Sequence, residues 1–432
     1  MPDRTARRRE FLKMVATSLG GALAVPSLVR SSALGADGAT APSDRTTFGV
    51  IGYGGRCRAI LGHFMAFGDA RCLAVSDCNM PRRHAAKARV DQHNKNTDCG
   101  DYPDFRDLLS RDDIDAVLIA TGDRWHTPAS IYAARAGKDI YTEKPISLSI
   151  AEGRAMADTM KRFGTIYQAG HQRRSVDSYR FQNEAVRTGA IGKLHTIHAR
   201  MWAGPRIGPQ APQPVPKGLD YDMWLGPTPW HPYTNARVGG WNYFWDTGAG
   251  PLIGMGCHYT DIAQWGHDSD DTGPVEYRGT ATWDLNAFSD TPITADITCT
   301  YADGVKLLMQ SQGAFADRFI RFIGDKGWIQ VDDQTNLITA SPASILKQRA
   351  VAARSWAHTG GHVRNWLDCI KSRQPTVCHP ESAQRATTIC HVLNIGLRLG
   401  RPVKWDPSAE RFVGDDEANR MISRAYRAPW AL

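Results

Sequence analysis

The chain has 432 residues, of which 42% are hydrophobic and 22% charged, a composition typical of globular proteins and sufficient for two domains. Its formal net charge of +8 comes from basic residues scattered among acidic ones, with no basic stripe interleaved with aromatic residues, which argues against nucleic acid as a partner. The nine cysteines form no Cys-x-x-Cys pair, so we expect buried thiols and no metal centre.

The first 36 residues have the pattern of an export signal. Arg8-Arg9-Glu10-Phe11-Leu12-Lys13 precedes a weakly apolar run from Met14 to Leu28, and small residues follow at 31–36. This order is typical of a twin-arginine signal peptide, and the alternative is a basic amphipathic first helix. The run is too short and too rich in Gly, Ser and Ala for a membrane span. We therefore predict a signal peptide over 1–36, a periplasmic mature protein without a membrane span, and a polar linker over 37–45.

A glycine-rich turn follows the first predicted strand. Residues 46–51 are apolar and partly β-branched, Gly52-Tyr53-Gly54-Gly55-Arg56-Cys57 comes next, and a helical pattern follows. Strand, glycine turn and helix form the context of a dinucleotide-binding fingerprint. Gly52 permits the tight turn, Gly54 lets the backbone approach a pyrophosphate, and the helix N-terminus attracts the phosphates. Cys57 takes the third glycine position, where a small residue still allows close packing. Gly52, Gly54, Gly55 and Arg56 are therefore candidate cofactor-binding residues.

The second predicted strand, residues 71–77, ends in an acid. Asp77 lies 20 residues after Cys57, where a carboxylate binds the adenine ribose hydroxyls. A carboxylate there repels a 2′-phosphate, so the sequence favours NAD, while Arg82 and Arg83 leave NADP open. The alternative is that Asp77 serves only as a turn residue at the strand end.

Strands and helices continue to alternate up to residue 168. Strands are expected at 115–120 and 139–142, and helices from His126 to 136 and at 150–163. This alternation predicts an α/β Rossmann domain with a doubly wound parallel sheet over 46–168. Ligands of such sheets bind at the carboxyl ends of the strands. Two polar clusters stand at such ends, residues 121–128 and Glu143-Lys144-Pro145.

From Lys193 onward the pattern changes. Strand-like segments at 194–202, 275–283, 293–301, 305–312 and 319–323 predict an α+β domain over 169–400 with a large, mostly antiparallel open sheet. Helices are expected at 362–371 and 382–399, and residues 401–432 form a tail that wraps back over the fold. An exposed face of this sheet would suit a homo-oligomer, a dimer or a tetramer.

A long loop over 203–250 is rich in Pro, Gly and aromatic residues, a composition that favours a functional lid. An aromatic face such as that of Trp241 can stack on a sugar ring, although these tryptophans can equally anchor the loop. His171 and Arg173 follow the predicted strand 165–169 and are expected at the domain junction. We take Trp241, His171 and Arg173 as candidate substrate-binding residues, the alternative for Arg173 and Arg174 being a plain surface pair.

Taken together, these motifs resemble the Gfo/Idh/MocA family, named for glucose–fructose oxidoreductase and inositol dehydrogenase. The most specific is the Gly-Lys-x-x-x-x-Glu-Lys-Pro string that ends at Pro145. The others are Gly52-Tyr53-Gly54-Gly55-Arg56, Ala120-Thr121 with His126, Gln168-Ala169-Gly170-His171-Gln172-Arg173-Arg174, Trp224-Leu225-Gly226-Pro227, and His258 with Asp261. The C-terminal Trp405-Asp406-Pro407 and Tyr426-Arg427-Ala428-Pro429-Trp430 look like an exported branch of the family.

The resemblance implies an NAD(P)-dependent oxidoreductase that acts on a hydroxyl of a sugar, glycoside or polyol and holds its cofactor tightly. Lys144 would lie beside the nicotinamide and the reacting hydroxyl, and His258 would be the general acid and base. Thr121, His126 and Glu143 would line the nicotinamide ribose side.

Elementary chemistry agrees with these roles. Histidine titrates near neutral pH and suits proton removal from a hydroxyl, and a lysine ammonium suits a developing alkoxide. Residues 256–265 predict a helix on which His258 and Asp261 share a face. Asp261 could orient the base or bind substrate, and the alternative for His258 is a hydrogen-bonded core histidine. Many family members carry an aspartate four residues before this histidine, where this chain has Gly254.

Three functions follow in order of preference. The first is net dehydrogenation of a carbohydrate. The second is an NAD-dependent glycosidase or lyase that oxidises its substrate transiently with a retained cofactor, which suits an exported enzyme because free NAD is scarce outside the cytoplasm. The third, motivated by Gly254, is a non-catalytic periplasmic sugar-binding protein.

Overall fold

The computed structural model describes residues 40–348 and 361–431. The expected signal peptide over 1–36 lies outside the described residues, as does most of the expected linker. Thr46–Leu432 forms one unit of the chain and Met1–Arg45 forms another, of which the structure describes one 3-10 turn, η3 (Pro42–Asp44).

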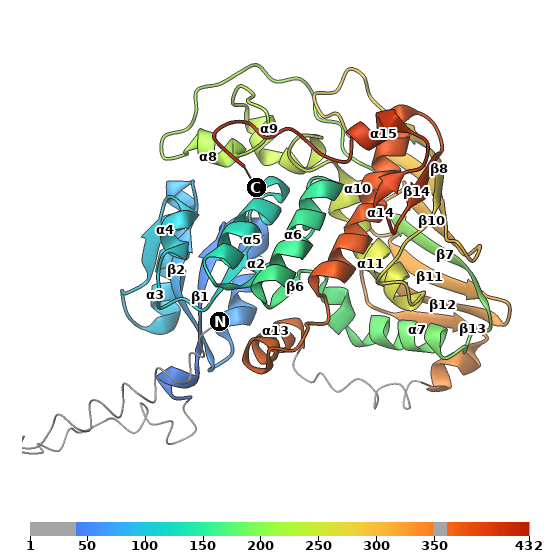
Figure 1. The fold of residues 1–432 in the computed structure, drawn as a ribbon, viewed down its shortest axis with the longest axis horizontal. Coiled ribbons are helices and arrows are strands. Elements are labelled where there is room, and N and C mark those ends of the chain that lie inside the picture. The colour runs from blue at the N-terminus through green and yellow to red at the C-terminus, as the bar shows by residue number, and fades with distance from the viewer. Residues whose placement is uncertain (1–39, 349–360, 432) are drawn as a thin grey trace, which may run out of the picture. The chain divides into compact units, whose positions relative to one another are not determined.

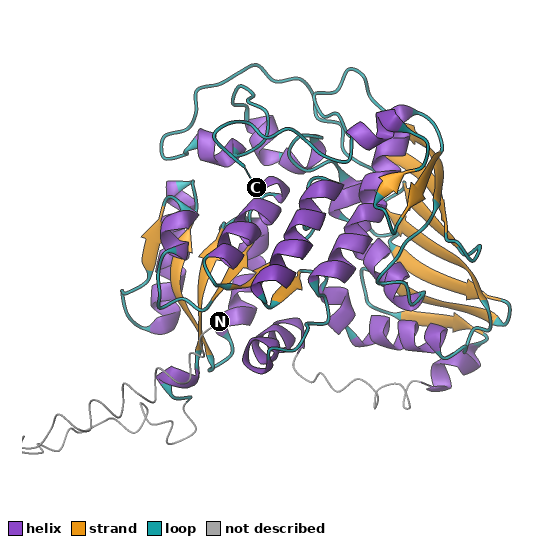
Figure 2. Cartoon of the chain, viewed as in Figure 1, coloured by secondary structure: helices purple, strands orange, loops and turns teal. Residues whose placement is uncertain are grey.

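The first sheet has six strands in the order β3-β2-β1-β4-β5-β6, and every pair in it is parallel (Figures 1 and 2). Helices cover both faces, so β4 and β5 are buried along their whole length, as their continuous apolar runs predict. The strands are β1 (Thr46–Ile51), β2 (Ala70–Ser76), β3 (Gly100–Tyr102), β4 (Ala116–Ile119), β5 (Asp139–Thr142) and β6 (Tyr167–Ala169). The helices are α2 (Gly55–Met65), α3 (Met80–Asn94), α4 (Phe105–Leu109), α5 (His126–Arg135) and α6 (Ile150–Phe163), with the 3-10 turn η4 (Asp123–Trp125).

The second sheet has nine strands in the order β13-β12-β11-β7-β10-β9-β8-β14-β15. In the described part of this second sheet, β7 and β10 form the only parallel pair, so the prediction of a mostly antiparallel sheet is confirmed. Its strands are β7 (Leu194–Met201), β8 (Glu276–Thr282), β9 (Thr294–Thr300), β10 (Lys306–Ser311), β11 (Phe319–Gly324), β12 (Gly327–Asp332), β13 (Ile338–Ser341), β14 (Val403–Asp406) and β15 (Arg411–Phe412). Buried residues alternate with partly exposed ones along β10 and β11, the pattern of a sheet packed on one face.

The remaining helices pack mainly against this sheet or over the ends of the first one. They are α7 (Asp177–Arg187), α8 (Tyr221–Leu225), α9 (Asn235–Gly239), α10 (Pro251–Gly254), α11 (Gly256–Gly266), α13 (Gly361–Ser372), α14 (Pro380–Leu399) and α15 (Asp416–Arg420). The 3-10 turns are η5 (Gln172–Ser175), η6 (Trp241–Tyr243) and η7 (Ala343–Gln348). Helix α14 contacts both α11 and α6, so it joins the two sheets through their covering helices (Figure 1).

Helix α13 does not pack with the second sheet, although it lies inside the segment expected for that domain. Its Trp366 is fully buried against Phe64 of α2 and Tyr141 of β5, with ring centroids 5.6 and 6.0 Å away. The chain therefore returns to the first domain after the second sheet, a long-range pairing that the local pattern does not indicate.

All nine cysteines lie in the described ranges and are free thiols, eight of them buried. None of the helices in the described residues is long and apolar enough to cross a bilayer.

Helix α14 carries a buried histidine away from the strand ends. His391 is 2% exposed and lies 3.4 Å from the Ser147 hydroxyl through Nε2, and burial together with the charge of Arg424 lowers its pKa to about 3. Because the unfolded chain binds a proton near pH 6.5 and the folded chain does not, this residue reduces stability as the pH falls below 6.5.

We expect His391→Gln to remove this pH dependence. Between pH 7.5 and 5.5 the variant should lose less unfolding free energy than the unaltered protein, by about 1.4 kcal/mol. Urea unfolding at the two pH values measures the difference, and any constant cost of the substitution cancels. An equal loss in both proteins would show that His391 is already charged in the folded state.

Candidate active site

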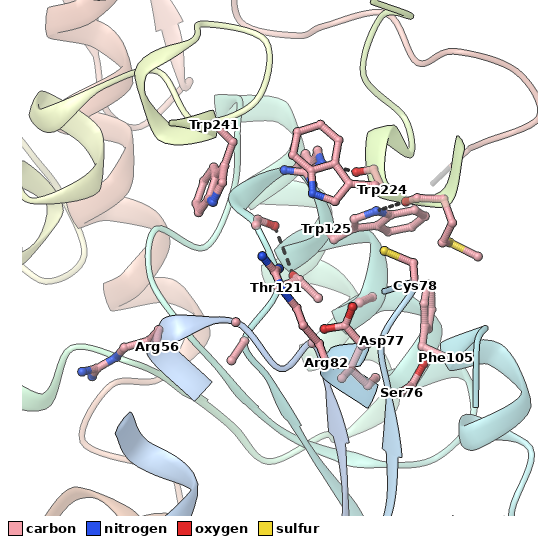
Figure 3. Close-up of a pocket in the computed structure, with 18 of the residues that line it drawn as sticks. Arg56, Ser76, Asp77, Cys78, Arg82, Phe105, Thr121, Trp125, Trp224 and Trp241 are labelled. Atoms are coloured by element: carbon pink, nitrogen blue, oxygen red, sulfur yellow. Dashed lines mark hydrogen bonds between the residues drawn. The ribbon is translucent and has the colours of Figure 1, made fainter. Parts of the chain in front are cut away.

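A pocket opens at the carboxyl ends of β1, β2 and β4, where a doubly wound sheet binds its ligands. Its volume is about 330 Å³. One wall is the edge of the first sheet, and the opposite wall comes from α8, α9 and η6 (Figure 3). The lining includes Gly52, Gly54, Gly55, Arg56, Asp77, Cys78, Arg82, Phe105, Thr121, Arg124, Trp125, Met223, Trp224 and Trp241.

The glycine turn leaves room for a group of atoms at the start of α2. Gly52 has φ +87°, and a Cβ there would lie 2.9 Å from the carbonyl oxygen of Ala120. By contrast, a Cβ on Gly54 or Gly55 would meet no described atom within 4 Å. Gly54 caps α2, whose first N–H groups have no partner within the helix. This open space at a helix N-terminus fits a pyrophosphate.

Cys57 lies at the third position of the fingerprint and is fully buried between α2 and the sheet. Burial raises the pKa of its thiol far above the ordinary value, so the group stays neutral. It therefore packs the helix closely against the strand, as the expected glycine would.

Asp77 follows β2 at the far end of the pocket. Its Oδ2 accepts a hydrogen bond of 2.7 Å from the Tyr53 N–H and its Oδ1 one of 2.8 Å from the Asn79 N–H, so the backbone fixes the carboxylate facing the pocket. Asp77 is thus both a turn residue and a pocket residue. Arg82 lines the same pocket, whereas Arg83 binds Asp101.

Lys144 follows β5 and reaches across to α10. Its Nζ donates a hydrogen bond of 2.6 Å to the carbonyl oxygen of Gly254, one helical turn before His258. A Cβ on Gly254 would meet no described atom within 4 Å, so open space remains beside this glycine. The contact holds Lys144 against the helix pair that carries His258, and the charge of Lys144 acts on the pKa of that histidine.

Several buried polar atoms around Lys144 have no hydrogen-bond partner in the described part of the chain. They are Asp123 Oδ2, His126 Nε2, Glu143 Oε2, His258 Nδ1, and both ring nitrogens of His171. The charge of Lys144 acts on the pKa of Asp123, His126, His171 and His258, which places these groups close to it. Such atoms are rare in folded proteins, and their concentration here is what the polar groups of a bound ligand would satisfy.

The imidazoles at this site are neutral. Burial, then Arg173 and Lys144, lowers the pKa of His258 well below its ordinary value, and burial with Arg174 and Lys144 does the same for His171. Burial also lowers the pKa of His126 to about 4. A neutral imidazole has a free nitrogen lone pair, so His258 and His171 are both in the protonation state that a base requires at pH 7.

Glu143 is held from two sides at the end of β5. Its Oε1 forms an ion pair with Arg56 Nε at 2.9 Å and accepts a hydrogen bond of 2.8 Å from Gln172 Nε2. His126 Nδ1 lies 2.6 Å from the Pro145 carbonyl oxygen and therefore carries the proton, and Thr121 donates to the carbonyl of Gly122. Arg56 points away from the other labelled pocket residues in Figure 3, toward its carboxylate partner.

Two predicted roles need correction. The Asp261 carboxylate, 1% exposed, accepts hydrogen bonds of 3.0 Å to both oxygens from Arg174 Nε, so it is a partner of Arg174 and does not orient His258. Arg173 binds Asp333 through Nε at 2.6 Å and Nη2 at 2.7 Å, so it forms an ion pair within the second domain in place of the expected substrate contact. Trp241 lines the cofactor pocket beside Arg124, so its side chain is not confined to a substrate site.

The sequence analysis missed most of the opposite wall. The Arg124 guanidinium lies 3.8 Å from the centroid of the Trp224 ring and donates to the Trp224 carbonyl, and Trp125 Nε1 donates to the Met223 carbonyl at 2.8 Å. Arg124 and Asp123 belong to the predicted polar cluster 121–128, and this cluster was the sequence feature from which their place at the site could have been predicted. The partners of Arg124 and Trp125 lie about one hundred residues away in the aromatic loop, and no local sequence pattern indicates these contacts.

Two glycine substitutions should separate binding from folding. We expect Gly54→Ala to fold with an unchanged melting temperature and to lose NAD affinity by about tenfold or more, because the added methyl enters the open space at the α2 N-terminus. Gly52→Ala should instead lower the melting temperature, because its backbone conformation disfavours any side chain. Calorimetric titration with NAD and thermal unfolding measure the two effects. Unchanged NAD affinity in Gly54→Ala would place the pyrophosphate elsewhere.

Comparisons with known proteins agree with this geometry. Residues 46–171 match the NAD-binding Rossmann fold of the oxidoreductase family Gfo/Idh/MocA, and residues 195–432 match the C-terminal alpha/beta domain of the same family. Myo-inositol 2-dehydrogenase of Thermotoga maritima is 30% identical over 173 residues, 40% of this chain and 47% of that protein. The 2,7-anhydro-N-acetylneuraminate hydratase of Mediterraneibacter gnavus is 34% identical over 102 residues, 24% of this chain and 27% of that protein. The matched regions thus span less than half of either curated relative.

A solved structure shares the fold over nearly its whole length. The WlbA dehydrogenase of Chromobacterium violaceum, in complex with NADH and UDP-GlcNAcA, superimposes with a TM-score of 0.65 at 16% identity, over 84% of this chain and 96% of that chain. Because both domain matches and the two observed sheets point to the same result, the chain belongs to the Gfo/Idh/MocA family of oxidoreductases and uses an NAD(P) cofactor.

Proposed function

We propose that this enzyme oxidises a CH–OH group of a sugar, glycoside or polyol, with Lys144 and His258 at the reaction centre. The observation that carries the proposal is the cluster of unpartnered buried polar atoms around Lys144, which the ion pair of Glu143 with Arg56 connects to the glycine turn. A polyhydroxylated substrate has the donors and acceptors to satisfy such a cluster.

The roles of the residues follow from charge and position. NAD(P) supplies the hydride acceptor. Neutral His258 accepts the hydroxyl proton, and the Lys144 ammonium stabilises the negative charge that develops on the oxygen. Thr121, His126 and Glu143 surround this centre from the first sheet. Because His258 is 6% exposed, the proton transfer takes place away from bulk water.

We favour NAD over NADP. The backbone holds the Asp77 carboxylate at the pocket, where it would repel a 2′-phosphate. Of the two arginines that could offset this charge, Arg83 is bound to Asp101, and Arg82 alone of the pair lines the pocket.

A specific observation supports a second candidate, redox-neutral chemistry with a retained cofactor. Residues 218–241, which we call the cover, attach directly to the chain that follows Asp77. The Asp220 N–H donates to the Cys78 carbonyl at 3.0 Å, and the Met80 N–H donates to the Gly218 carbonyl at 2.7 Å. The cover would therefore have to detach from the first domain before a dinucleotide could leave by this side.

The C-terminal tail secures the cover. The Arg427 N–H donates to the Pro227 carbonyl at 2.9 Å, and the Arg427 guanidinium binds Asp222 of α8 at 2.6 Å. Trp430 packs edge-on against Trp125, with ring centroids 4.9 Å apart. A cofactor that is never released must return to its starting oxidation state in every cycle, so the overall reaction is redox-neutral. Addition or removal of water is such a reaction, and one matched relative is called a hydratase.

We also propose twin-arginine export of the mature protein to the periplasm and assembly as a dimer or tetramer. The basis for export is the Arg8-Arg9 pattern, which lies outside the described residues. The basis for assembly is the partly exposed face of the second sheet.

Lys144→Met should abolish chemistry while sparing the fold. We expect at least about a hundredfold slower cofactor reduction in a single turnover, because the developing charge loses its ammonium. The assay mixes NAD-loaded protein with myo-inositol and a panel of p-nitrophenyl glycosides and follows the absorbance of reduced nicotinamide. The exposed Lys326→Met is the matched control. Reduction at the unaltered rate in Lys144→Met would remove Lys144 from the centre, and no reduction by the unaltered protein with any probe would favour the non-catalytic alternative.

The double substitution Arg427→Ala with Trp430→Ala should loosen the cofactor. We expect about tenfold faster release of bound NADH, followed by its fluorescence after dilution into excess NAD, because the cover loses its tail anchors. Arg411→Ala in β15 is the control. Equal release rates in all three proteins would show that the tail does not retain the dinucleotide.

A further inference from the structure

Among the buried histidines of the described chain, His171 alone has both ring nitrogens enclosed and without a partner, although His258 also makes no hydrogen bond. His171 lies directly after β6, is 0% exposed, and neither ring nitrogen has a hydrogen-bond partner among the described residues. His362 uses both nitrogens, with Ser175 Oγ at 2.8 Å and the Ala169 carbonyl at 2.9 Å. His126 and His391 each use one. An imidazole with two unpartnered nitrogens in the interior costs free energy that an apolar side chain of similar size would not, so a packing role alone does not account for it.

The position of His171 gives its nitrogens a use. Its ring lies edge-to-face with that of His258, with centroids 5.5 Å apart and an interplanar angle of 89°. Rings in this arrangement contact each other without a hydrogen bond between them, so the unpartnered nitrogens of both remain available to a third group. The charge of Lys144 acts on both rings. Two bases therefore flank one ammonium.

The groups that face His171 keep it neutral. Arg173, Arg174 and Lys144 are the cations that act on it, and Asp270 is the opposing acid. Arg174 is bound by Asp261 and Asp270, and Arg173 by Asp333, so these arginines are held in ion pairs. Neutral His362 is a further neighbour, tied to Ser175 and the backbone. None of these contacts protonates the ring near neutral pH, so His171 can act as a base.

Oxidation of an alcohol needs one base, and this site holds two. We propose that His171 is a second catalytic residue, which removes the C–H proton next to the carbon that is oxidised. This inference rests on the proposed function and narrows it to redox-neutral elimination, or hydration in the reverse direction, of a polyhydroxylated substrate.

The step balances without a further reactant. His258 holds the proton of the oxidised hydroxyl, and the hydride resides on the retained cofactor. The neighbouring C–H proton passes to a nitrogen of His171, and its bonding pair becomes an enolate whose oxygen faces Lys144. That pair expels a leaving group from the next carbon, and the leaving group departs with the proton that His171 holds; hydration is the same step in reverse. Return of the hydride to the carbonyl carbon and of the proton from His258 restores the alcohol.

A ketone probe isolates this step from oxidation. We would incubate NAD-loaded protein with 2-keto-myo-inositol in D₂O and follow loss of the α-proton signals by NMR, against a protein-free blank. Oxidised NAD cannot reduce the ketone, so exchange reports proton removal alone. We expect the unaltered protein to accelerate exchange, and His171→Asn to slow it by about a hundredfold with little change in the ketone KM. His391→Gln, a buried histidine of α14, is the matched control.

Oxidation by the same variant is measured separately, as cofactor reduction in a single turnover with the alcohol panel. We expect His171→Asn to retain it within about tenfold, and to retain the NAD content and melting temperature of the unaltered protein. Absence of exchange in an unaltered protein that does reduce its cofactor would overturn this inference and leave the proposed function standing. The inference would also be overturned if His171→Asn exchanged the α-proton as fast as the unaltered protein does. The same holds if the variant lost exchange and cofactor reduction to the same extent. Absence of both reactions in the unaltered protein would overturn the proposed function itself.

Discussion

The hydrogen bond from Lys144 Nζ to the Gly254 carbonyl determines how the site is assembled. It joins the end of a strand in the first sheet to the helix pair that carries His258, and it fixes a positive charge among groups that are otherwise buried. That charge reaches Asp123, His126, His171 and His258. The Lys144 ammonium thus lies where the two domains meet, and its charge acts on polar groups from both domains.

The electrostatics of this centre have a chemical consequence. His258 lies near the charges of Arg173 and Lys144 and has no carboxylate hydrogen bond in the described part of the chain, because Asp261 is bound to Arg174. A base of lowered pKa removes an alcohol proton poorly unless the resulting oxyanion is stabilised. The Lys144 ammonium provides that stabilisation, so proton acceptance and charge stabilisation depend on each other here.

The sequence was informative where function depends on local spacing. The strand, glycine turn and helix around Gly52 and the acid at Asp77 follow from short patterns combined with the rule that parallel strands end on one edge. The pairing of Lys144 with His258 was expected from the family resemblance and not from spacing. The ion pairs of Arg174 with Asp261 and of Arg173 with Asp333 were not foreseen, because they join residues 87 and 160 positions apart. The same reason explains α13, which packs on the first sheet from within the second segment, and the cover, whose contacts with Cys78 and Trp125 come from a loop more than ninety residues away.

The most direct test of this account is a crystal structure of the protein with NAD bound. The account requires the pyrophosphate at Gly54 and Gly55, the adenine ribose at Asp77, and the nicotinamide ring against Lys144 with His258 within reach of a substrate hydroxyl. A dinucleotide that occupies the pocket with its nicotinamide end directed away from Lys144, or protein that takes up no dinucleotide at all, would contradict it.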